Sequence, residues 1–261
     1  MSLILIRGGG DIASGVALRL HRCGYKIIIS ELPSPLAVRR TVSFSEAIYS
    51  GEIKIEELYA RRAETNLDAF RLAEQNCIPV IIDPQAAILD SSDFSAMVDA
   101  RLLKRKADSY LLAAPLVIGL GPGFVCGENC HAVVETQRGH HLGRVFWSGS
   151  ASADTGQPEG DPRRVLRAPV NGVITNHAQI GEYIDGGQII ADVAGEKIIA
   201  PFSGVLRGII RSGITVSENM KIGDIDPRGK TDYCYTVSDK ALAVGGGVLE
   251  ALLTRPTQIR I

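Results

Sequence analysis

Short apolar runs alternate with amphipathic stretches through the first half of the chain. Four apolar runs predict buried strands, at residues 3–6, 26–30, 79–82 and 116–120. Three stretches with a helical spacing of apolar positions predict helices, at residues 12–22, 67–75 and 94–104. Strands that alternate with helices favour right-handed crossovers and a parallel sheet with helices on both faces. We therefore predict a Rossmann-like α/β domain over residues 1–150.

The pattern changes at residues 148–162, where small polar residues and turn formers replace the apolar runs. Such a segment has little to bury and cannot form a long helix. We predict a linker at residues 151–165.

An internal repeat follows this linker. Residues 168–174, Ala-Pro-Val-Asn-Gly-Val-Ile, return as residues 200–206, Ala-Pro-Phe-Ser-Gly-Val-Leu. Two copies of a glycine-rich, β-branched unit predict a small pseudo-symmetric β domain over residues 166–232. The segment resembles the barrel-sandwich fold of biotinyl and lipoyl carrier domains. Those carriers present a lysine between the two copies, whereas Lys197 lies just before Ala200. We therefore predict the architecture without the carrier role.

Residues 233–261 predict a final strand around residues 234–237 and a helix over residues 241–252. Three consecutive glycines, Gly245, Gly246 and Gly247, fall inside this helix, and each costs about 1 kcal/mol relative to alanine. We expect close packing against another backbone to compensate, with the first domain as the expected partner.

The first glycine-rich turn is a candidate anion site. Gly8, Gly10 and Ala13 fit the G-x-G-x-x-A form of the dinucleotide fingerprint, between a strand and a helix. Glu31 closes the next strand, where an acidic residue binds ribose hydroxyls in that fingerprint. Asp11 opposes this interpretation, because its carboxylate could cap the helix and occupy the N–H groups that a phosphate needs. A ligand site, with or without NAD, and a tight turn capped by Asp11 both stay open.

A second glycine loop follows the apolar run at residues 116–120 and contains Gly119, Gly121 and Gly123. A dense polar stretch comes next, with Glu135, Arg138, His140 and Arg144. We interpret both as the other wall of an anion-binding cleft, since arginines bind phosphate bidentately and Glu135 or His140 could transfer a proton. The alternative is a hairpin with a solvated polar tip at residues 135–139.

Composition narrows the function classes. The 261 residues carry a formal net charge of −1, which gives no reason to expect nucleic acid or a membrane surface as a partner. No apolar stretch approaches the roughly 18 residues of a spanning helix. The five scattered cysteines suit a reducing cytoplasm better than a disulfide framework. Cys126, Cys130 and His131 match no standard zinc spacing, so structural cysteines, a reactive thiol and zinc stay open, and we assign no metal.

Several segments together resemble a bacterial family called YqeB, described as a selenium-dependent molybdenum hydroxylase system protein. The segments are Arg-Gly-Gly-Gly-Asp at residues 7–11, Arg-Arg-Thr-Val-Ser-Phe at 39–44, Gly-Leu-Gly-Pro-Gly-Phe at 119–124, the polar stretch 135–144, and the triple glycine at 245–247. The resemblance spans nearly the whole chain. It implies an accessory role in maturing a molybdenum-containing hydroxylase, and it assigns no catalytic residue.

These observations lead us to expect a small anionic ligand, either a molybdopterin-type cofactor or a nucleotide, bound between the two glycine loops. The expected binding residues are Gly8, Gly9, Gly10, Asp11, Glu31, Gly119, Gly121, Gly123, Glu135, Arg138, His140 and Arg144. A molybdenum hydroxylase is the expected protein partner. The alternatives are an NAD(P)-dependent oxidoreductase and a non-catalytic interaction scaffold.

Overall fold

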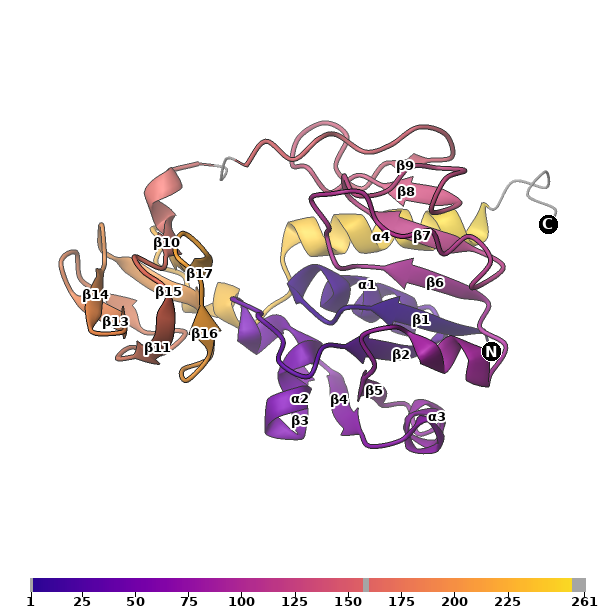
Figure 1. Cartoon of the computed structure of the whole chain (residues 1–261), viewed down its shortest axis with the longest axis horizontal. Coiled ribbons are helices and arrows are strands. Elements are labelled where there is room, and N and C mark those ends of the chain that lie inside the picture. Colours follow the sequence, from indigo (N-terminus) through magenta and orange to yellow (C-terminus); the bar gives the residue numbers. More distant parts are fainter. Residues whose placement is uncertain (1, 157–159, 255–261) are drawn as a thin grey trace. The chain divides into compact units, whose positions relative to one another are not determined.

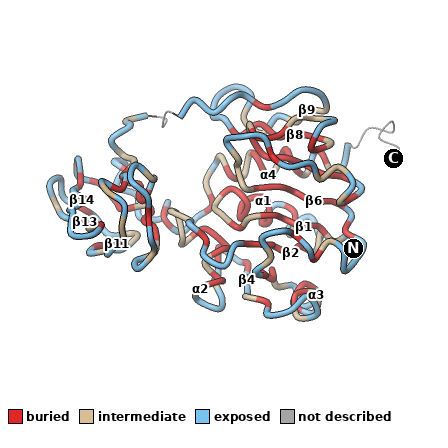
Figure 2. Tube along the Cα trace, viewed as in Figure 1, coloured by how far each residue is buried: buried red, intermediate tan, exposed pale blue. Residues whose placement is uncertain are grey.

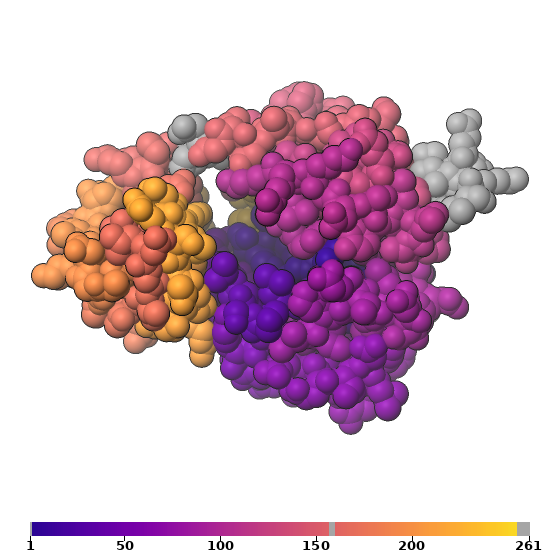
Figure 3. Space-filling view, in the orientation of Figure 1, coloured from indigo at the N-terminus to yellow at the C-terminus, as the bar shows by residue number. Residues whose placement is uncertain are grey.

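The computed structural model describes residues 2–156 and 160–254, which divide into two compact units (Figure 1). The first unit comprises Met1–Pro35, Phe44–Thr155 and Val237–Ile261, as far as these are described. The second comprises Leu36–Ser43 and Gly156–Thr236, and most of it is orange in the space-filling view (Figure 3). Each unit is therefore built from separate stretches of the chain. The sequence led us to expect the C-terminal helix beside the first domain, but not the segment Leu36–Ser43 in the second unit.

The described part of the first unit contains a nine-stranded sheet with the order β3-β4-β5-β2-β1-β6-β7-β8-β9. Neighbours from β4 to β8 are parallel, and the β3–β4 and β8–β9 pairs at the two edges are antiparallel. The strands are β1 (Leu3–Arg7), β2 (Lys26–Glu31), β3 (Glu52–Ile55), β4 (Leu58–Ala63), β5 (Ile78–Ile82), β6 (Ala96–Asp99), β7 (Val117–Leu120), β8 (Ala132–Val134) and β9 (Val145–Phe146).

The helices of this unit are α1 (Asp11–Arg22), α2 (Ala47–Ser50), α3 (Asn66–Glu74) and α4 (Asp239–Leu253), with short 3₁₀ turns η2 (Phe44–Glu46) and η3 (Ala87–Ser91). Thr65 caps α3 by accepting a hydrogen bond from the N–H of Asp68, and Ser238 caps α4 in the same way through Ala241. The predicted helices at residues 12–22 and 67–75 are confirmed as α1 and α3. No helix in the described ranges is long and apolar enough to cross a membrane.

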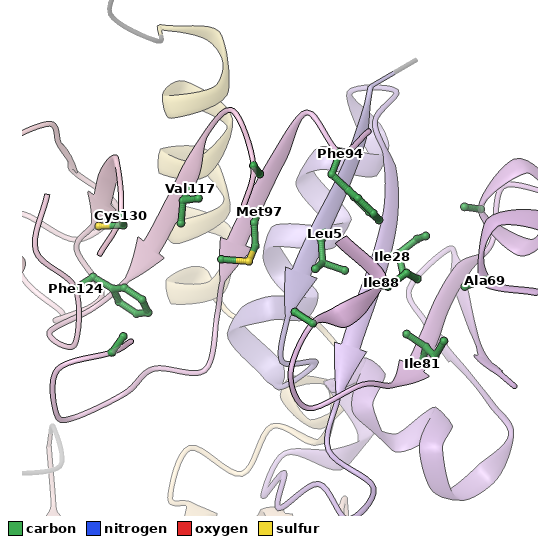
Figure 4. Packing of buried hydrophobic residues seen from close by; sticks show 14 of the residues in the cluster. Leu5, Ile28, Ala69, Ile81, Ile88, Phe94, Met97, Val117, Phe124 and Cys130 are labelled. Carbon is green, nitrogen blue, oxygen red and sulfur yellow. The ribbon is translucent and has the colours of Figure 1, made fainter. Parts of the chain in front are cut away.

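The core of this unit lies on the central strands, which are buried along their length (Figure 2). Leu5, Ile28, Met97 and Val117 come from four neighbouring strands and pack together on one face (Figure 4). Burial on both faces explains why these strands read as unbroken apolar runs. The strands predicted from those runs are confirmed.

The glycines of α4 bring its backbone against α1. A Cβ atom on Gly15 would come within 2.5 Å of the Cβ of Ala241, and one on Gly245 within 2.8 Å of the carbonyl oxygen of Gly15. A Cβ on Gly247 would overlap the carbonyl oxygen of Gly143. The expected close packing of the glycine-rich helix against another backbone is therefore confirmed.

The second unit contains two four-stranded antiparallel sheets, ordered β10-β17-β15-β12 and β14-β13-β11-β16 among its described strands. The strands are β10 (Val165–Arg167), β11 (Gly172–Asn176), β12 (Tyr183–Ile184), β13 (Ile189–Val193), β14 (Glu196–Ile199), β15 (Gly204–Ile209), β16 (Thr215–Val216) and β17 (Lys221–Asp226). Three 3₁₀ turns, η1 (Arg40–Val42), η4 (Pro162–Arg164) and η5 (Thr231–Cys234), complete it.

The sequence repeat places equivalent strands in opposite sheets. The first copy supplies β11, β12 and β13, and the second supplies β15, β16 and β17 at the same spacing. Each sheet thus takes strands from both copies, and side chains such as Ile174, Ile190, Leu206 and Ile222 fill a shared core. The predicted pseudo-symmetric arrangement of short strands is confirmed.

The predicted fold class is wrong for both units. The large sheet is mixed rather than Rossmann-like, and residues 94–104 form β6 and a loop instead of a crossover helix. Residues 96–99 are buried throughout, and periodicity alone cannot separate a buried strand from a buried helix. In the second unit, two separate antiparallel sheets replace the biotinyl-like barrel-sandwich. The predicted strand at residues 234–237 is also wrong, because η5 ends at Cys234 and residues 235–237 form a turn and a loop.

Candidate functional site

Charged side chains gather where the parallel strands of the first unit end. Arg7, Glu31 and Asp99 are the last residues of β1, β2 and β6, and Glu135 directly follows β8. The carboxyl ends of parallel strands meet at one edge of a sheet, where ligands bind in open α/β sheets. All four residues are at most 9% exposed. Burying a charged group costs free energy unless the group is paired. The partners of each group therefore show whether its charge is already satisfied within the protein.

Arg7 keeps hydrogen-bond donors without acceptors. Its Nη2 donates to the carbonyl oxygen of Pro84 at 2.7 Å, and its guanidinium lies 4.6 Å from the ring centroid of Tyr110. Its Nη1 lies 3.9 Å from Asp99 Oδ2, too far for a hydrogen bond. Within the described ranges, the buried Nε and Nη1 of Arg7 have no hydrogen-bond partner.

Asp99 is neutralised by another arginine. Both of its oxygens accept hydrogen bonds from Arg101, at 2.9 Å from Nε and 2.6 Å from Nη2. This bidentate pair satisfies the carboxylate, which is fully buried. The second arginine at this edge, Arg7, is consequently left with donor capacity that Asp99 does not use.

The first glycine turn leads from β1 into α1 with open space above the helix start. Gly8 has φ +90°, a conformation that favours glycine, and a Cβ on Gly9 would come within 2.9 Å of the backbone nitrogen of Ser45. Gly10 is the N-cap, and a Cβ there would meet no heavy atom within 4 Å. Asp11, which the sequence offered as a capping residue, is instead the first helical residue of α1.

Glu31 holds this turn in place. Its Oε2 accepts a hydrogen bond from the N–H of Gly9 at 2.7 Å, and its Oε1 accepts one from the N–H of Leu32 at 2.7 Å. Burial raises the pKa of the Glu31 carboxyl above its ordinary value, although the two N–H donors oppose the shift. Both oxygens are thus engaged with backbone, and ribose binding by Glu31 stays a prediction.

The second glycine loop is filled by the protein itself. A Cβ on Gly119 would overlap the ring of Phe124. One on Gly121 would come within 2.8 Å of Thr136 Oγ1, and one on Gly123 within 2.8 Å of the carbonyl oxygen of Arg105. These three glycines permit close internal packing, and their positions offer no open cradle comparable to that of Gly10.

Glu135 ties two loops to the end of β8. Its oxygens accept hydrogen bonds from the N–H groups of Gln137 at 2.7 Å and Ser152 at 2.8 Å. Burial acts to raise the pKa of the Glu135 carboxyl, but these backbone donors outweigh it and hold the pKa below its ordinary value. An ionised, doubly bonded carboxylate of this kind suits loop anchoring better than proton transfer.

Arg138 lies at the same end of the unit as the glycine turn. It forms a bidentate ion pair with Asp239, the first residue of α4, at 2.6 and 2.7 Å. Because Ala241 packs on Gly15, α4 starts beside the beginning of α1. His140 and Arg144 are exposed on the loop that follows, with the ring of His140 edge-on to His141. The structure therefore places Arg138 at the end of the unit that holds the glycine turn, but its guanidinium is already paired with the Asp239 carboxylate.

Sequence reasoning missed three members of this cluster: Asp99, Arg101 and Tyr110. The first two were hidden inside a segment predicted to be helical. A charged residue immediately after the apolar run at residues 96–98 was the signal for a strand that ends at the sheet edge. Tyr110 lies in a long loop between β6 and β7, where the sequence offers no comparable signal.

The fold and the site define an α/β protein whose mixed sheet ends in a buried cluster of charged side chains beside an open helix start. Comparison with known proteins adds one close relative. The chain is 46% identical over 255 residues to YqeB of Escherichia coli (strain K12), a protein of uncharacterized function. This similarity supports the family membership expected from the sequence. The match covers 96% of this chain and 47% of YqeB, so the chain spans about half the length of that relative.

No protein-family model matches the chain. Among solved structures, an aspartoacylase family protein from Mesorhizobium loti is 12% identical with a TM-score of 0.29, covering 86% of this chain and 84% of that one. A succinylglutamate desuccinylase from Silicibacter is 14% identical with a TM-score of 0.26 and the same coverage. At such TM-scores nothing about the activity of this chain follows from these structures.

Proposed function

We propose that the chain is an accessory protein in the maturation of a molybdenum-containing hydroxylase, and that it binds an anionic cofactor or nucleotide of the molybdopterin type. The link to a hydroxylase rests on the family resemblance. The binding of an anion rests on Arg7, a buried guanidinium with two unpaired donor atoms at the carboxyl edge of the sheet.

The donors at this edge suit phosphate. Guanidinium groups bind phosphate oxygens by charge-assisted hydrogen bonds, and a helix start offers backbone N–H groups and a positive dipole end. The open space at Gly10 admits a ligand atom to the first turn of α1, and Gly8 follows Arg7 directly. The residues present thus fit the phosphate part of a molybdopterin or nucleotide, and Arg7 and the turn Gly8–Gly10 are the residues that would hold it.

The alternation of side chains along β1 limits the ligand further. Arg7 points to the same face of the sheet as Leu5, and the core cluster on that face includes Leu5 and Ala69 of α3. The helices α1 and α4 lie behind the strands in the view of Figure 4, on the other face. A ligand that uses both Arg7 and the start of α1 must cross the sheet edge at Gly8. A pyrophosphate, which molybdopterin dinucleotides and nucleoside diphosphates contain, carries two phosphoryl groups, one for each side of this edge, whereas a single phosphate carries one.

Calorimetric titration of the purified protein tests the binding. The probes are inorganic phosphate, pyrophosphate, CDP, CTP, NADP and isolated molybdopterin, and we expect pyrophosphate-containing probes to bind more tightly than phosphate. Arg7→Lys keeps the charge but loses the planar fork, and we expect it to weaken binding by about tenfold, or about 1.4 kcal/mol. Binding of NADP alone would favour the oxidoreductase alternative, and binding of none of the probes would favour the scaffold.

A second variant separates binding from folding. Gly10→Ser places a hydroxyl at the N-cap, where it can accept a hydrogen bond from the first turn of α1 and compete with the ligand. We expect unchanged or slightly higher stability together with weaker pyrophosphate binding. Gly246→Ala, at a helical position that is equally open, is the matched control and should bind normally. Wild-type affinity in both Arg7→Lys and Gly10→Ser would contradict the proposed site.

The hydroxylase link needs its own test. In a strain that lacks the gene, the wild type and Gly246→Ala should restore molybdenum hydroxylase activity, and Gly10→Ser should restore less. Full hydroxylase activity in the strain without the gene would refute the maturation role while leaving anion binding intact.

A further inference from the structure

Two cysteines outside the charged cluster are held side by side. Cys126 and Cys130 lie in the loop between β7 and β8 and pair with each other in an isolated parallel β-bridge. The N–H of Gly127 donates to the carbonyl oxygen of Cys130 at 2.9 Å, which closes the loop on itself. The two thiols are close enough for each to shift the pKa of the other, and Cys126 Sγ donates to the carbonyl oxygen of Phe146 at 3.2 Å.

The backbone spacing suits a covalent bond between them. Neighbouring strands lie about 5 Å apart, which is inside the roughly 4.4–6.8 Å that separates the Cα atoms of a disulfide. All five cysteines of the chain are free thiols, and the other three, Cys23, Cys77 and Cys234, belong to separate parts of the sequence. The structure therefore presents one dithiol whose closure needs little movement.

The two thiols differ in environment. Cys126 is half-buried and next to the exposed residues Gly127 and Glu128, whereas Cys130 is fully buried in the core. The hydrogen bond from Cys130 lowers the pKa of the Cys126 thiol, and the same contact together with burial raises the pKa of Cys130. An accessible thiol with the lower pKa attacks, and its buried neighbour resolves the product.

We propose that Cys126 and Cys130 form a redox-active dithiol that reduces low-molecular-weight disulfides and closes reversibly into an intramolecular disulfide. The Cys126 thiolate attacks one sulfur of the small disulfide, which breaks its S–S bond and releases one thiol as a mixed disulfide forms on Cys126. The Cys130 sulfur then attacks Cys126 Sγ and breaks the S–S bond of the mixed disulfide, and the departing sulfur takes the Cys130 proton and leaves as the second small thiol. Overall, one disulfide and two cysteine thiols give one protein disulfide and two small thiols. This proposal is independent of anion binding.

Mass spectrometry of the native protein treated with glutathione disulfide tests it. Trypsin releases residues 107–138 as one peptide, because no lysine or arginine lies between Lys106 and Arg138, and this peptide contains both cysteines and no other. We expect it to lose two hydrogen atoms, and to regain them on treatment with dithiothreitol, before Cys77 is modified. Cys77 is the comparison because it is also half-buried, but burial raises the pKa of its thiol.

Two variants assign the roles. Cys130→Ser should accumulate glutathione on Cys126, since the resolving thiol is absent. Cys126→Ser should leave Cys130 unmodified, while Cys77→Ser should behave like the wild type. A stable glutathione adduct on Cys126 in the wild type, or a peptide 107–138 that stays fully reduced while Cys77 reacts, would overturn the proposal.

Discussion

The carboxylate of Glu31 accepts a hydrogen bond from the backbone N–H of Gly9 at 2.7 Å. This contact joins the end of β2 to the glycine turn that follows β1, and it uses a group that the dinucleotide fingerprint reserves for ribose. The Glu31 carboxylate thus holds the turn. The position that is open to a ligand is the next residue, Gly10.

Glu31→Gln should destabilise the first unit. An amide can accept only one of the two hydrogen bonds from Gly9 and Leu32, and an unsatisfied buried N–H costs about 1–3 kcal/mol. Because burial raises the folded-state pKa of Glu31 above 4.5, its favourable contribution is present at low pH and is lost as the pH rises through that pKa. The stability gap between wild type and variant, measured by urea unfolding, should therefore narrow from about pH 4 to about pH 7. A gap that widens over this range would contradict the assigned direction.

Glu135→Gln should show the opposite pH dependence. The N–H donors of Gln137 and Ser152 hold the pKa of Glu135 below 4.5, so its contribution is present above that value and is lost as the pH falls through the folded-state pKa. The same urea series should give a gap that grows as the pH rises from the acid side. Parallel slopes for Glu31→Gln and Glu135→Gln would show that one of the two carboxyls is misassigned.

The three consecutive glycines of α4 should respond differently to alanine. Gly246→Ala meets open space and should stabilise the unit by up to about 1 kcal/mol, the helix-propensity difference. Gly247→Ala would drive a methyl group into the carbonyl oxygen of Gly143 and should cost about 1–3 kcal/mol. Thermal unfolding of the two variants distinguishes them directly, and equal shifts would contradict the packing of α4 on the β8–β9 loop.

The ion pair between Arg138 and Asp239 should contribute little to stability. Its side chains are 35% and 74% exposed, and exposed pairs contribute about 0.2–1 kcal/mol. A double-mutant cycle with Arg138→Gln and Asp239→Asn should give a coupling energy in that range, and added salt should reduce it. A much larger, salt-insensitive coupling would mean that the pair is shielded from solvent.

Local patterns in the sequence were sufficient for much of the first unit. The apolar run at residues 3–6, the glycine turn and the helix at residues 12–22 all follow from side-chain periodicity and hydrogen-bonding rules acting within a few residues. The same rules failed at residues 94–104, because a strand buried on both faces has no polar face to reveal its period. That error removed Asp99 and Arg101 from the expected site.

The second glycine loop illustrates a different limit. Gly119, Gly121 and Gly123 look like the first loop in the sequence, yet Phe124, Thr136 and Arg105 occupy the space beside them. Whether a glycine faces a ligand or a neighbouring side chain depends on residues brought close only by the complete fold. The ion pair between Arg138 and Asp239 joins residues more than a hundred positions apart. Local sequence patterns cannot predict such a pair for the same reason.

The contact between Gly15 and Ala241 joins two helices that are synthesised at very different times. These residues lie more than two hundred positions apart in the sequence, so the ribosome exposes the small-residue face of α1 long before α4 exists to cover it. The strands from β10 to β17 are synthesised before α4 and pair only with one another. We expect α1 to stay partly uncovered in the nascent chain until α4 emerges.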